Sequence, residues 1–149
     1  MNYKIISKFI KDISFELPSV KAFLMIEKEI PNYSLNFDIN SKPYKDNIIE
    51  VNTILKIAPG QDVKNKILTE ITGTALVSIE KNFEDKKELE KIILIKVPTE
   101  MYPTLYDTFV YLFKQAGVKT IQIDKKVDFE KLYNEKKIIN YNNFLVGQT

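Results

Sequence analysis

The stretch KDISFELPS, residues 11–19, contains two carboxylates, Asp12 and Glu16, that could form a catalytic pair. Asp12 and Glu16 alternate with apolar residues, and this period of two predicts a strand with one acidic face and one apolar face. Paired carboxylates can act as acid and base, but four residues along a strand span about 13 Å, which is too far for a catalytic pair. On pattern alone the acidic face is a solvated surface, unless side chains from other strands complete a site with it.

The residue types that the chain lacks exclude most catalytic chemistry. There is no His and no Cys, which removes imidazole bases, thiolate nucleophiles, disulfides and nearly every ligand set for transition metals. With four glycines and no glycine-rich phosphate motif, a nucleotide site is not supported either. We therefore expect a protein that is not an enzyme and has no cofactor or metal; acid–base catalysis by Asp, Glu, Lys or Tyr is the remaining enzymatic alternative.

The charge pattern disfavours nucleic acid as a partner. All 22 basic residues are lysines, and 20 acidic residues reduce the net charge to +2. Without arginine, the planar fork that reads guanine is missing, and a nearly neutral chain has no long-range field for a polyanion. The lysine pairs at 86–87, 125–126 and 136–137 adjoin acidic residues, a pattern typical of solvated surface.

Length and composition predict one domain over residues 1–149. The chain has 149 residues, of which 44% are hydrophobic, enough to bury a core. We expect this core to cover residues 1–137 and an apolar C-terminal tail to cover 138–149. Charged residues interrupt the N-terminal stretch, and no segment approaches roughly 18 consecutive apolar residues, so we expect a cytoplasmic protein without stable membrane insertion.

The first half of the chain has the pattern of a sheet. Four stretches alternate with a period near two, at residues 3–17, 32–40, 47–57 and 66–80. Pro59 and Gly60 suit the two central positions of a type II turn, which predicts an antiparallel hairpin between the third and fourth strands. Gly73, inside the fourth strand, predicts a bulge or a bend.

The second half changes to a helical period. A helix is predicted over residues 83–98 and ends at Pro98. A second helix is predicted to begin at Pro103 and to end at Gly117. Its apolar residues cover more than one face, so it must be buried on two sides, and since a monomer rarely exposes such a patch, we expect oligomerisation.

The last part of the chain predicts two short elements. Residues 119–125 suggest an extended segment, and residues 128–137 suggest a terminal helix with Asp128 as its N-cap. The elements together predict an α+β protein that assembles through a helix.

The opening stretch also resembles a known family. The run KDISFE, closing on Pro18, is similar to the first-strand signature of the SecB family of bacterial protein-export chaperones. In the same order, PNYSLNFDIN, IIEVNTILKI and LTEITGTALVSI resemble the second, third and fourth strands of that family. VPTEMYPTLYDTF resembles the segment leading into its long helix, and VDFEKLY the start of its last helix. The resemblance covers about residues 3–133.

The resemblance implies a fold and a function. The implied subunit is α+β, with a four-stranded antiparallel sheet and C-terminal helices packed on one face, assembled as a dimer of dimers, a homotetramer. Family members bind unfolded preproteins without ATP, keep them translocation-competent and deliver them to the SecA motor ATPase. They are not enzymes.

The resemblance also implies a role for the acidic face. In the family, residues on the outer sheet face engage the motor, and the matching positions here are Asp12, Glu16, Leu68 and Glu70. If the first and fourth strands are neighbours, three carboxylates surround one leucine and form a small docking patch that would attract a basic partner.

Apolar residues supply candidates for two further surfaces. Those for the client groove are Phe23, Ile30, Tyr33, Tyr102 and Tyr106, with plain core packing as an equally weighted alternative. Those for the interface between subunits are Phe109, Leu112 and Phe113.

Two departures from the family pattern motivate other functions. Residues 104–107 read TLYD where family members typically have Tyr-Ala-Arg-Glu, and the chain ends in IINYNNFLVGQT rather than in a polar tail. This C-terminus predicts that a second motor contact is missing or altered. The alternatives are a SecB-like chaperone dedicated to one partner, such as the antitoxin of a toxin–antitoxin pair, and a non-catalytic ligand-binding α+β protein.

Overall fold

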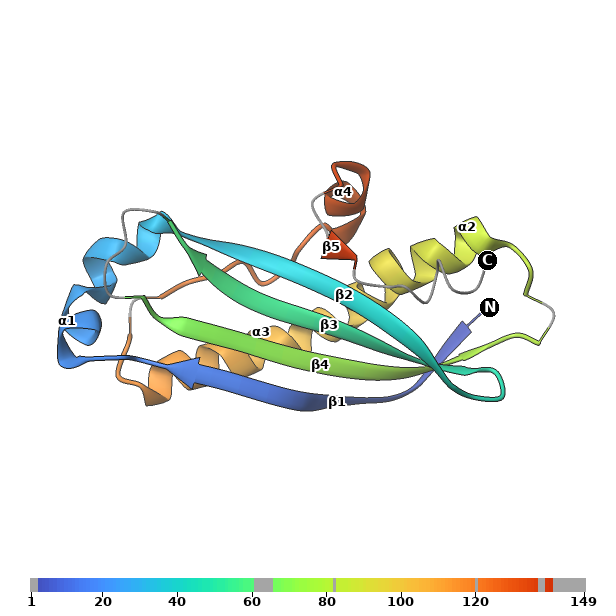
Figure 1. Cartoon of the computed structure of the whole chain (residues 1–149), viewed down its shortest axis with the longest axis horizontal. Helices are drawn as coiled ribbons and strands as arrows, with labels where there is room; N and C mark the ends of the chain where they lie inside the picture. Colours follow the sequence, from blue (N-terminus) through green and yellow to red (C-terminus); the bar gives the residue numbers. More distant parts are fainter. Residues whose placement is uncertain (1–2, 61–65, 82, 120, 137–138, 141–149) are drawn as a thin grey trace.

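Four long antiparallel strands and a long helical segment make up most of the protein. The computed structural model describes residues 3–60, 66–81, 83–119, 121–136 and 139–140. The strands are β1 (Tyr3–Glu16), β2 (Tyr33–Lys45), β3 (Ile48–Pro59) and β4 (Leu68–Ile79), and they lie in the order β1-β4-β3-β2 (Figure 1). The predicted α+β class and the four-stranded antiparallel sheet are confirmed. A two-residue strand, β5 (Ile139–Asn140), adds to β2 in parallel and was not predicted.

β2, β3 and β4 follow one another in the chain and pair antiparallel. β2 and β3 are joined by Asp46 and Asn47, and Asp46 has a φ of 49°, which Asp and Asn tolerate better than most residues. β3 and β4 pair antiparallel, which confirms the predicted pairing. The predicted turn after Pro59 and Gly60 continues into residues 61–65, which lie outside the described residues.

A helix between β1 and β2 was missed by the sequence reasoning. α1 (Val20–Glu29) begins after Ser19, whose side chain accepts a hydrogen bond from the N–H of Ala22 at 3.0 Å. It buries Ala22 and Ile26 and continues into a short 3₁₀ turn, η1 (Ile30–Asn32). The signal was the N-cap serine directly after Pro18.

The two predicted long helices are one continuous helical segment. α2 (Lys86–Lys91), the π-helical turn η2 (Ile92–Lys96) and α3 (Val97–Gln115) follow one another without a break. The predictions that Pro98 ends a helix and that Pro103 begins the next are therefore wrong.

The physical reason is the place of each proline in the helix. In the π turn the N–H of Val97 bonds to the carbonyl of Ile92, five residues back, and Pro98, which has no N–H, comes directly after this turn, where the regular hydrogen-bond ladder is already interrupted. Pro103 lies inside α3 with its side chain exposed. At that position the carbonyl that loses its partner can bond to water.

The predicted C-terminal end of α3 and the predicted N-cap of the last helix are confirmed, although that last helix stops at Asn134, before the predicted end at residue 137. Gly117, with a φ of 86°, follows α3, and the N–H of Val118 bonds to the carbonyl of Phe113 at 2.9 Å. Asp128 caps α4 (Phe129–Asn134) by accepting a hydrogen bond from the N–H of Lys131. The predicted extended segment 119–125 forms no strand in its described residues.

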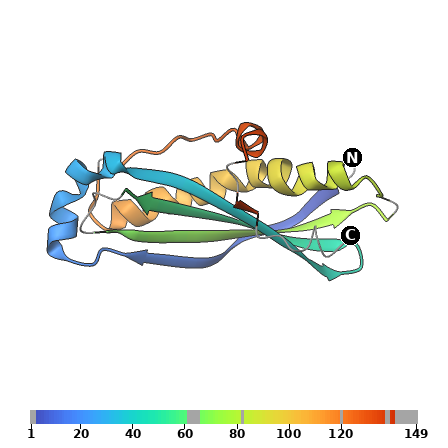
Figure 2. The ribbon, with the colours of Figure 1, turned by 45° about the horizontal axis from the view of Figure 1, so that its top comes forward.

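The core lies between the sheet and α3, which crosses behind the strands (Figures 1 and 2). At Gly73 a Cβ would come within 2.5 Å of Met101 Cε and 3.0 Å of Leu105 Cδ2, so the missing side chain lets α3 approach β4. The bulge predicted near Gly73 lies on the neighbouring strand. Ile10 pairs with Gly73, Asp12 pairs with Thr72, and Lys11 is the extra residue of β1.

Candidate partner-binding surfaces

The predicted docking residues come together on the sheet face opposite α3. In the β1–β4 ladder Glu16 lies opposite Leu68, and Glu70 lies opposite Ser14, midway between Asp12 and Glu16. Side chains alternate along a strand, so these residues point away from the face on which Gly73 contacts α3. The three carboxylates are exposed, and Leu68 is 54% exposed. We call Asp12, Glu16, Leu68 and Glu70 the acidic patch.

A lysine beside the acidic patch was not found from the sequence. Lys56 of β3 lies opposite Glu70, and it forms an ion pair with Asp38 of β2, whose side chain is 1% exposed. A buried carboxylate needs such a partner because an unpaired charge is costly away from water. Only the strand register reveals that this cation borders the patch, since Lys56 and Glu70 belong to different strands.

The client-groove candidates fall into two separate groups. Phe23 lies on α1 beside Gly117, Ile30 begins the 3₁₀ turn η1, and Tyr33 begins β2. The Tyr33 hydroxyl accepts a hydrogen bond from the N–H of Ile67 at 2.9 Å, and burial raises the pKa of Tyr33. These half-buried and exposed residues lie at the α1 end of the molecule (Figure 1).

The second group lies on α3. Tyr102 is almost completely buried, and its hydroxyl donates a hydrogen bond to the Asp124 carbonyl at 2.5 Å. Burial, and after it the charge of Asp124, raise the pKa of Tyr102 to about 12. Tyr106 is half-buried, with its ring centroid 6.2 Å from that of Tyr102. In the described part of the chain no ring contact or hydrogen bond joins this pair to Phe23, Ile30 or Tyr33.

A cavity of about 340 Å³ adjoins Tyr102. It lies between α3 and the irregular segment that leads to α4, and its lining residues are Thr99, Tyr102, Pro103, Lys125, Lys126 and Val127. The sequence predicts solvated surface for Lys125 and Lys126. In the structure both lysines line this cavity.

The residues proposed for the subunit interface divide between core and surface. Phe109 and Phe113 are fully buried in the single chain, stacked with centroids 4.5 Å apart, and Phe113 contacts Phe15 edge-on at 5.1 Å. Leu112 is half-buried. The exposed apolar side chains of α3 are Val110 and Tyr111, which are 37% and 60% exposed. The large apolar side chains that this part of α3 offers at the surface are therefore Val110, Tyr111 and Leu112, whereas Phe109 and Phe113 pack into the core.

The described residues include neither a metal-binding cluster nor a membrane-spanning helix. They contain no group of three or more acidic side chains arranged to hold a metal ion. None of their helices has the length and apolar character needed to cross a bilayer.

The sequence matches known proteins over most of its length. Residues 1–139 match the SecB family, described as preprotein translocase subunit SecB. The chain is 44% identical over 135 residues to a SecB protein-export protein of Pelagibacter ubique, covering 91% of this chain and 96% of that protein. It is 28% identical over 141 residues to the protein-export protein SecB of Anaplasma marginale (strain Florida), covering 87% of this chain and 79% of that protein.

A solved structure shares the fold. The SecB-like chaperone of Mycobacterium tuberculosis, in complex with a ChAD peptide from the HigA1 antitoxin, superposes with a TM-score of 0.65 at 11% identity, covering 85% of this chain and 88% of that chain. With the match over residues 1–139, the strand order and the identity to named relatives, the chain belongs to the SecB family of protein-export proteins.

Proposed function

We propose that this protein is a cytoplasmic chaperone that binds unfolded preproteins without ATP, keeps them translocation-competent and delivers them to the SecA motor. The observation that carries the proposal is the acidic patch, assembled from β1 and β4 in a chain of the SecB family. Exposed carboxylates around an exposed leucine combine electrostatic attraction with a small apolar contact. Such a surface suits a basic partner that must bind and leave quickly.

The client surface is proposed to be apolar and distributed. α1 exposes Val20, Phe23 and Leu24, and the cavity beside Tyr102 offers a second apolar site on α3. Separate apolar sites suit an unfolded chain, because each contributes a little affinity and none reads a strict sequence. Binding through several weak sites gains strength from their linkage in one client chain.

Assembly into a dimer of dimers would join these sites. The exposed side of α3, with Val110, Tyr111 and Leu112, is the proposed subunit contact. Its aromatic and aliphatic surface is the kind that homo-oligomers bury. In a tetramer, client sites from several subunits would line one surface, and a single long client could occupy them together.

The deciding experiment mixes the purified full chain with several denatured preproteins and several unrelated unfolded proteins. Light scattering then measures the mass of the protein alone and of each complex, with folded forms of the same clients as controls. We expect a tetramer that binds many unfolded chains, in the absence of ATP, and does not bind the folded forms. A monomer that binds none of them contradicts the chaperone proposal.

A chaperone dedicated to one partner is the second candidate. It is supported by the shared fold with a chaperone solved with an antitoxin peptide, and by a C-terminal segment that pairs with β2 through β5. The same experiment separates the two candidates. Binding of a single partner, with no affinity for the other unfolded chains, favours the dedicated chaperone.

A further inference from the structure

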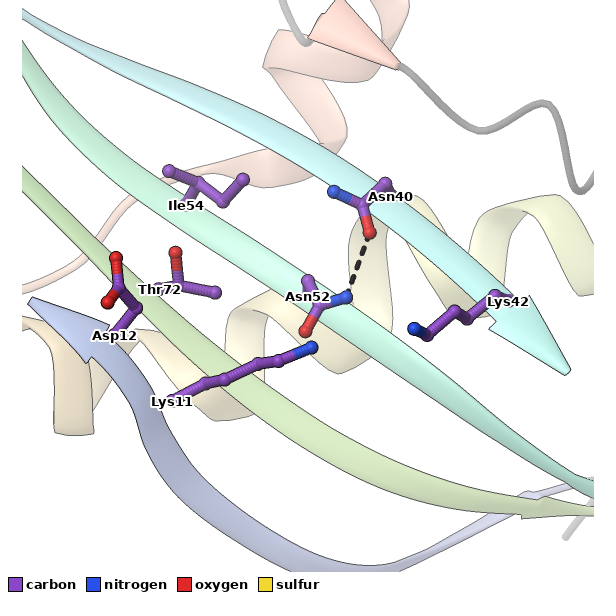
Figure 3. A pocket seen from close by; sticks show the side chains of 7 residues that line it. All are labelled: Lys11, Asp12, Asn40, Lys42, Asn52, Ile54 and Thr72. Atoms are coloured by element: carbon purple, nitrogen blue, oxygen red, sulfur yellow. Dashed lines mark hydrogen bonds between the residues drawn. The ribbon is translucent and has the colours of Figure 1, made fainter. Parts of the chain in front are cut away.

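A shallow hollow of about 520 Å³ lies on the outer sheet face next to the acidic patch (Figure 3). Its lining residues come from all four long strands: Lys11, Asp12, Asn40, Lys42, Asn52, Ile54 and Thr72. Figure 3 shows Asp12 at one end and the ammonium groups of Lys11 and Lys42 at the other, with Thr72 and Ile54 toward the Asp12 end. The hollow therefore has a negative end and a positive end.

The bulge in β1 creates the positive end. Lys11 is the extra residue between Ile10 and Asp12, and the bulge directs its side chain across the sheet to Glu50 of β3, with Lys11 Nζ 2.8 Å from Glu50 Oε2. Lys42 of β2 approaches the same oxygen from the other side at 3.9 Å. Two ammonium groups thus share one carboxylate, and the positive end keeps an excess positive charge.

A ladder of polar side chains holds this end in place. Asn52 donates to Glu50 Oε2 and to Asn40 Oδ1, each at 2.9 Å, and accepts a hydrogen bond from Thr74 at 2.6 Å. Burial would raise the pKa of Glu50, but the hydrogen bonds from Lys11 and Asn52 and the charges of Lys11 and Lys42 hold it below its usual value. Glu50 is therefore ionised at neutral pH, and its Oε2 atom already accepts from Lys11 and Asn52.

Hydrogen-bond donors remain for a ligand. Each ammonium has three N–H groups, and Lys42 lies too far from Glu50 for a direct hydrogen bond. The Asn40 oxygen accepts from Asn52, and the Asn40 amide nitrogen points toward Ile54 and away from Lys42 in Figure 3. Lys11 and Lys42 together can donate to one further carboxylate beside Glu50.

The spacing of the two ends defines the ligand. Asn52 marks the positive end, because its amide nitrogen and the Lys11 ammonium both contact Glu50 Oε2. Asp12 lies two strands away from Asn52 and two residues further along the sheet. With strands about 4.8 Å apart and about 3.3 Å per residue, the separation is roughly 12 Å. In an extended chain, side chains four positions apart point to the same side and are about 13 Å apart.

We propose that this hollow binds an extended partner segment that carries a basic and an acidic side chain four positions apart. The basic side chain contacts Asp12 and the rest of the acidic patch, and the carboxylate is held by Lys11 and Lys42. The inference rests on the proposed docking function, and it adds that the partner segment carries both charges in a fixed spacing. A purely basic segment leaves the positive end unfilled and binds less tightly.

The first test uses short synthetic peptides with a Thr- and Gln-rich extended sequence. One carries Lys and Glu four positions apart, and the matched peptides replace Glu by Gln, replace Lys by Gln, or move Glu by one position to the opposite side. Calorimetry at low salt measures their affinity for the full chain. We expect each change to weaken binding about fivefold, since a paired charge contributes of order 1 kcal/mol at a partly exposed site. Equal affinities, or no binding by any peptide, overturn the proposal.

The second test changes the protein. Lys42→Glu is chosen because Lys42 makes no hydrogen bond to Glu50, and Lys4→Glu is the matched control because Lys4 lies on the same sheet face, opposite Ser78 and outside the hollow. We expect Lys42→Glu to lower the affinity for the Lys/Glu peptide about fivefold. A peptide with Lys in place of Glu should bind this variant with the original affinity. Lys4→Glu should change neither affinity. If Lys4→Glu also lowers the affinity for the Lys/Glu peptide, or if the peptide with Lys in place of Glu does not regain affinity for Lys42→Glu, the ligand carboxylate does not bind at the positive end.

The same variants separate this inference from the docking proposal. If reversal of the acidic patch weakens motor binding and Lys42→Glu does not, the charge-pair inference fails while the docking proposal stands. If neither variant changes motor binding, the docking proposal fails as well.

Discussion

Glu16 of β1 lies directly opposite Leu68 of β4 in the antiparallel ladder between these strands. With Glu70 opposite Ser14 and Asp12 opposite Thr72, this pairing aligns three carboxylates on the sheet face away from α3, and the exposed Leu68 lies at the Glu16 end of the row. The predicted neighbourhood of the first and fourth strands is thereby confirmed. A shift of one residue in register would have sent Leu68 and Glu70 into the core.

The acidic patch predicts a separation of motor binding from client binding. Changing Asp12, Glu16 and Glu70 together to Lys should weaken binding of the SecA motor about tenfold or more at low salt, because three attractive charges become repulsive. Affinity for unfolded clients should stay the same. Surface plasmon resonance at several salt concentrations measures the first quantity, and light scattering of client complexes the second.

Controls for this prediction lie elsewhere on the surface. Glu80, Glu84 and Glu130 are exposed and outside the patch, so their change to Lys alters the net charge equally without touching β1 or the outer face of β4. If this control loses as much motor affinity as the patch variant, only net charge matters. Unchanged motor affinity of the patch variant at low salt would remove the docking proposal.

The exposed side of α3 predicts a change in mass on substitution. Val110→Lys with Tyr111→Lys should reduce the proposed tetramer to smaller species, because a charged surface replaces the proposed apolar contact. Phe109→Ala, on the buried side, should instead destabilise the fold by about 3–5 kcal/mol. Light scattering and urea unfolding distinguish the two results. A tetramer that survives the double lysine variant places the subunit contact elsewhere.

Close packing at Gly73 predicts a large stability effect from a small side chain. Gly73→Val should lower the free energy of unfolding by about 1–3 kcal/mol, because its side chain would overlap Met101 and Leu105. Thr72→Val, next to it on the outer face, should stay within about 0.5 kcal/mol. Urea unfolding measures both. Combining Gly73→Val with Met101→Ala should cost less than the sum of the two changes, and strict additivity would argue against the contact.

The burial of Tyr102 predicts a loss of stability at alkaline pH. The pKa of about 12, raised from 10.0 by burial first and by Asp124 next, means that the fold favours the neutral phenol. The contribution of Tyr102 to stability is thus complete below pH 10.0 and is lost as the pH rises toward about 12. Absorbance titration of the protein minus that of Tyr102→Phe should show one tyrosine ionising near pH 12. Ionisation of this group near pH 10 would contradict its buried hydrogen bond to Asp124.

The local elements followed from the sequence where a single signal decided them. Alternation located all four long strands, Asp128 marked the start of α4, and Gly117 marked the end of α3. Each depends on residues close together in the chain. The same local reasoning failed at Pro98 and Pro103, because a π turn and an exposed helix side let one long helical segment include both prolines.

The α+β class, the four long strands and the cap at Asp128 could be read from the sequence, and its likeness to the SecB family indicated four residues on the outer sheet face. The folded chain was needed to show that Glu70 lies beside Lys56, that the bulge at Lys11 directs its ammonium group to Glu50, and that Phe109 and Phe113 belong to the core. The physical reason is that local propensity is set by near neighbours, whereas register, bulges and burial depend on contacts between strands that are distant in sequence.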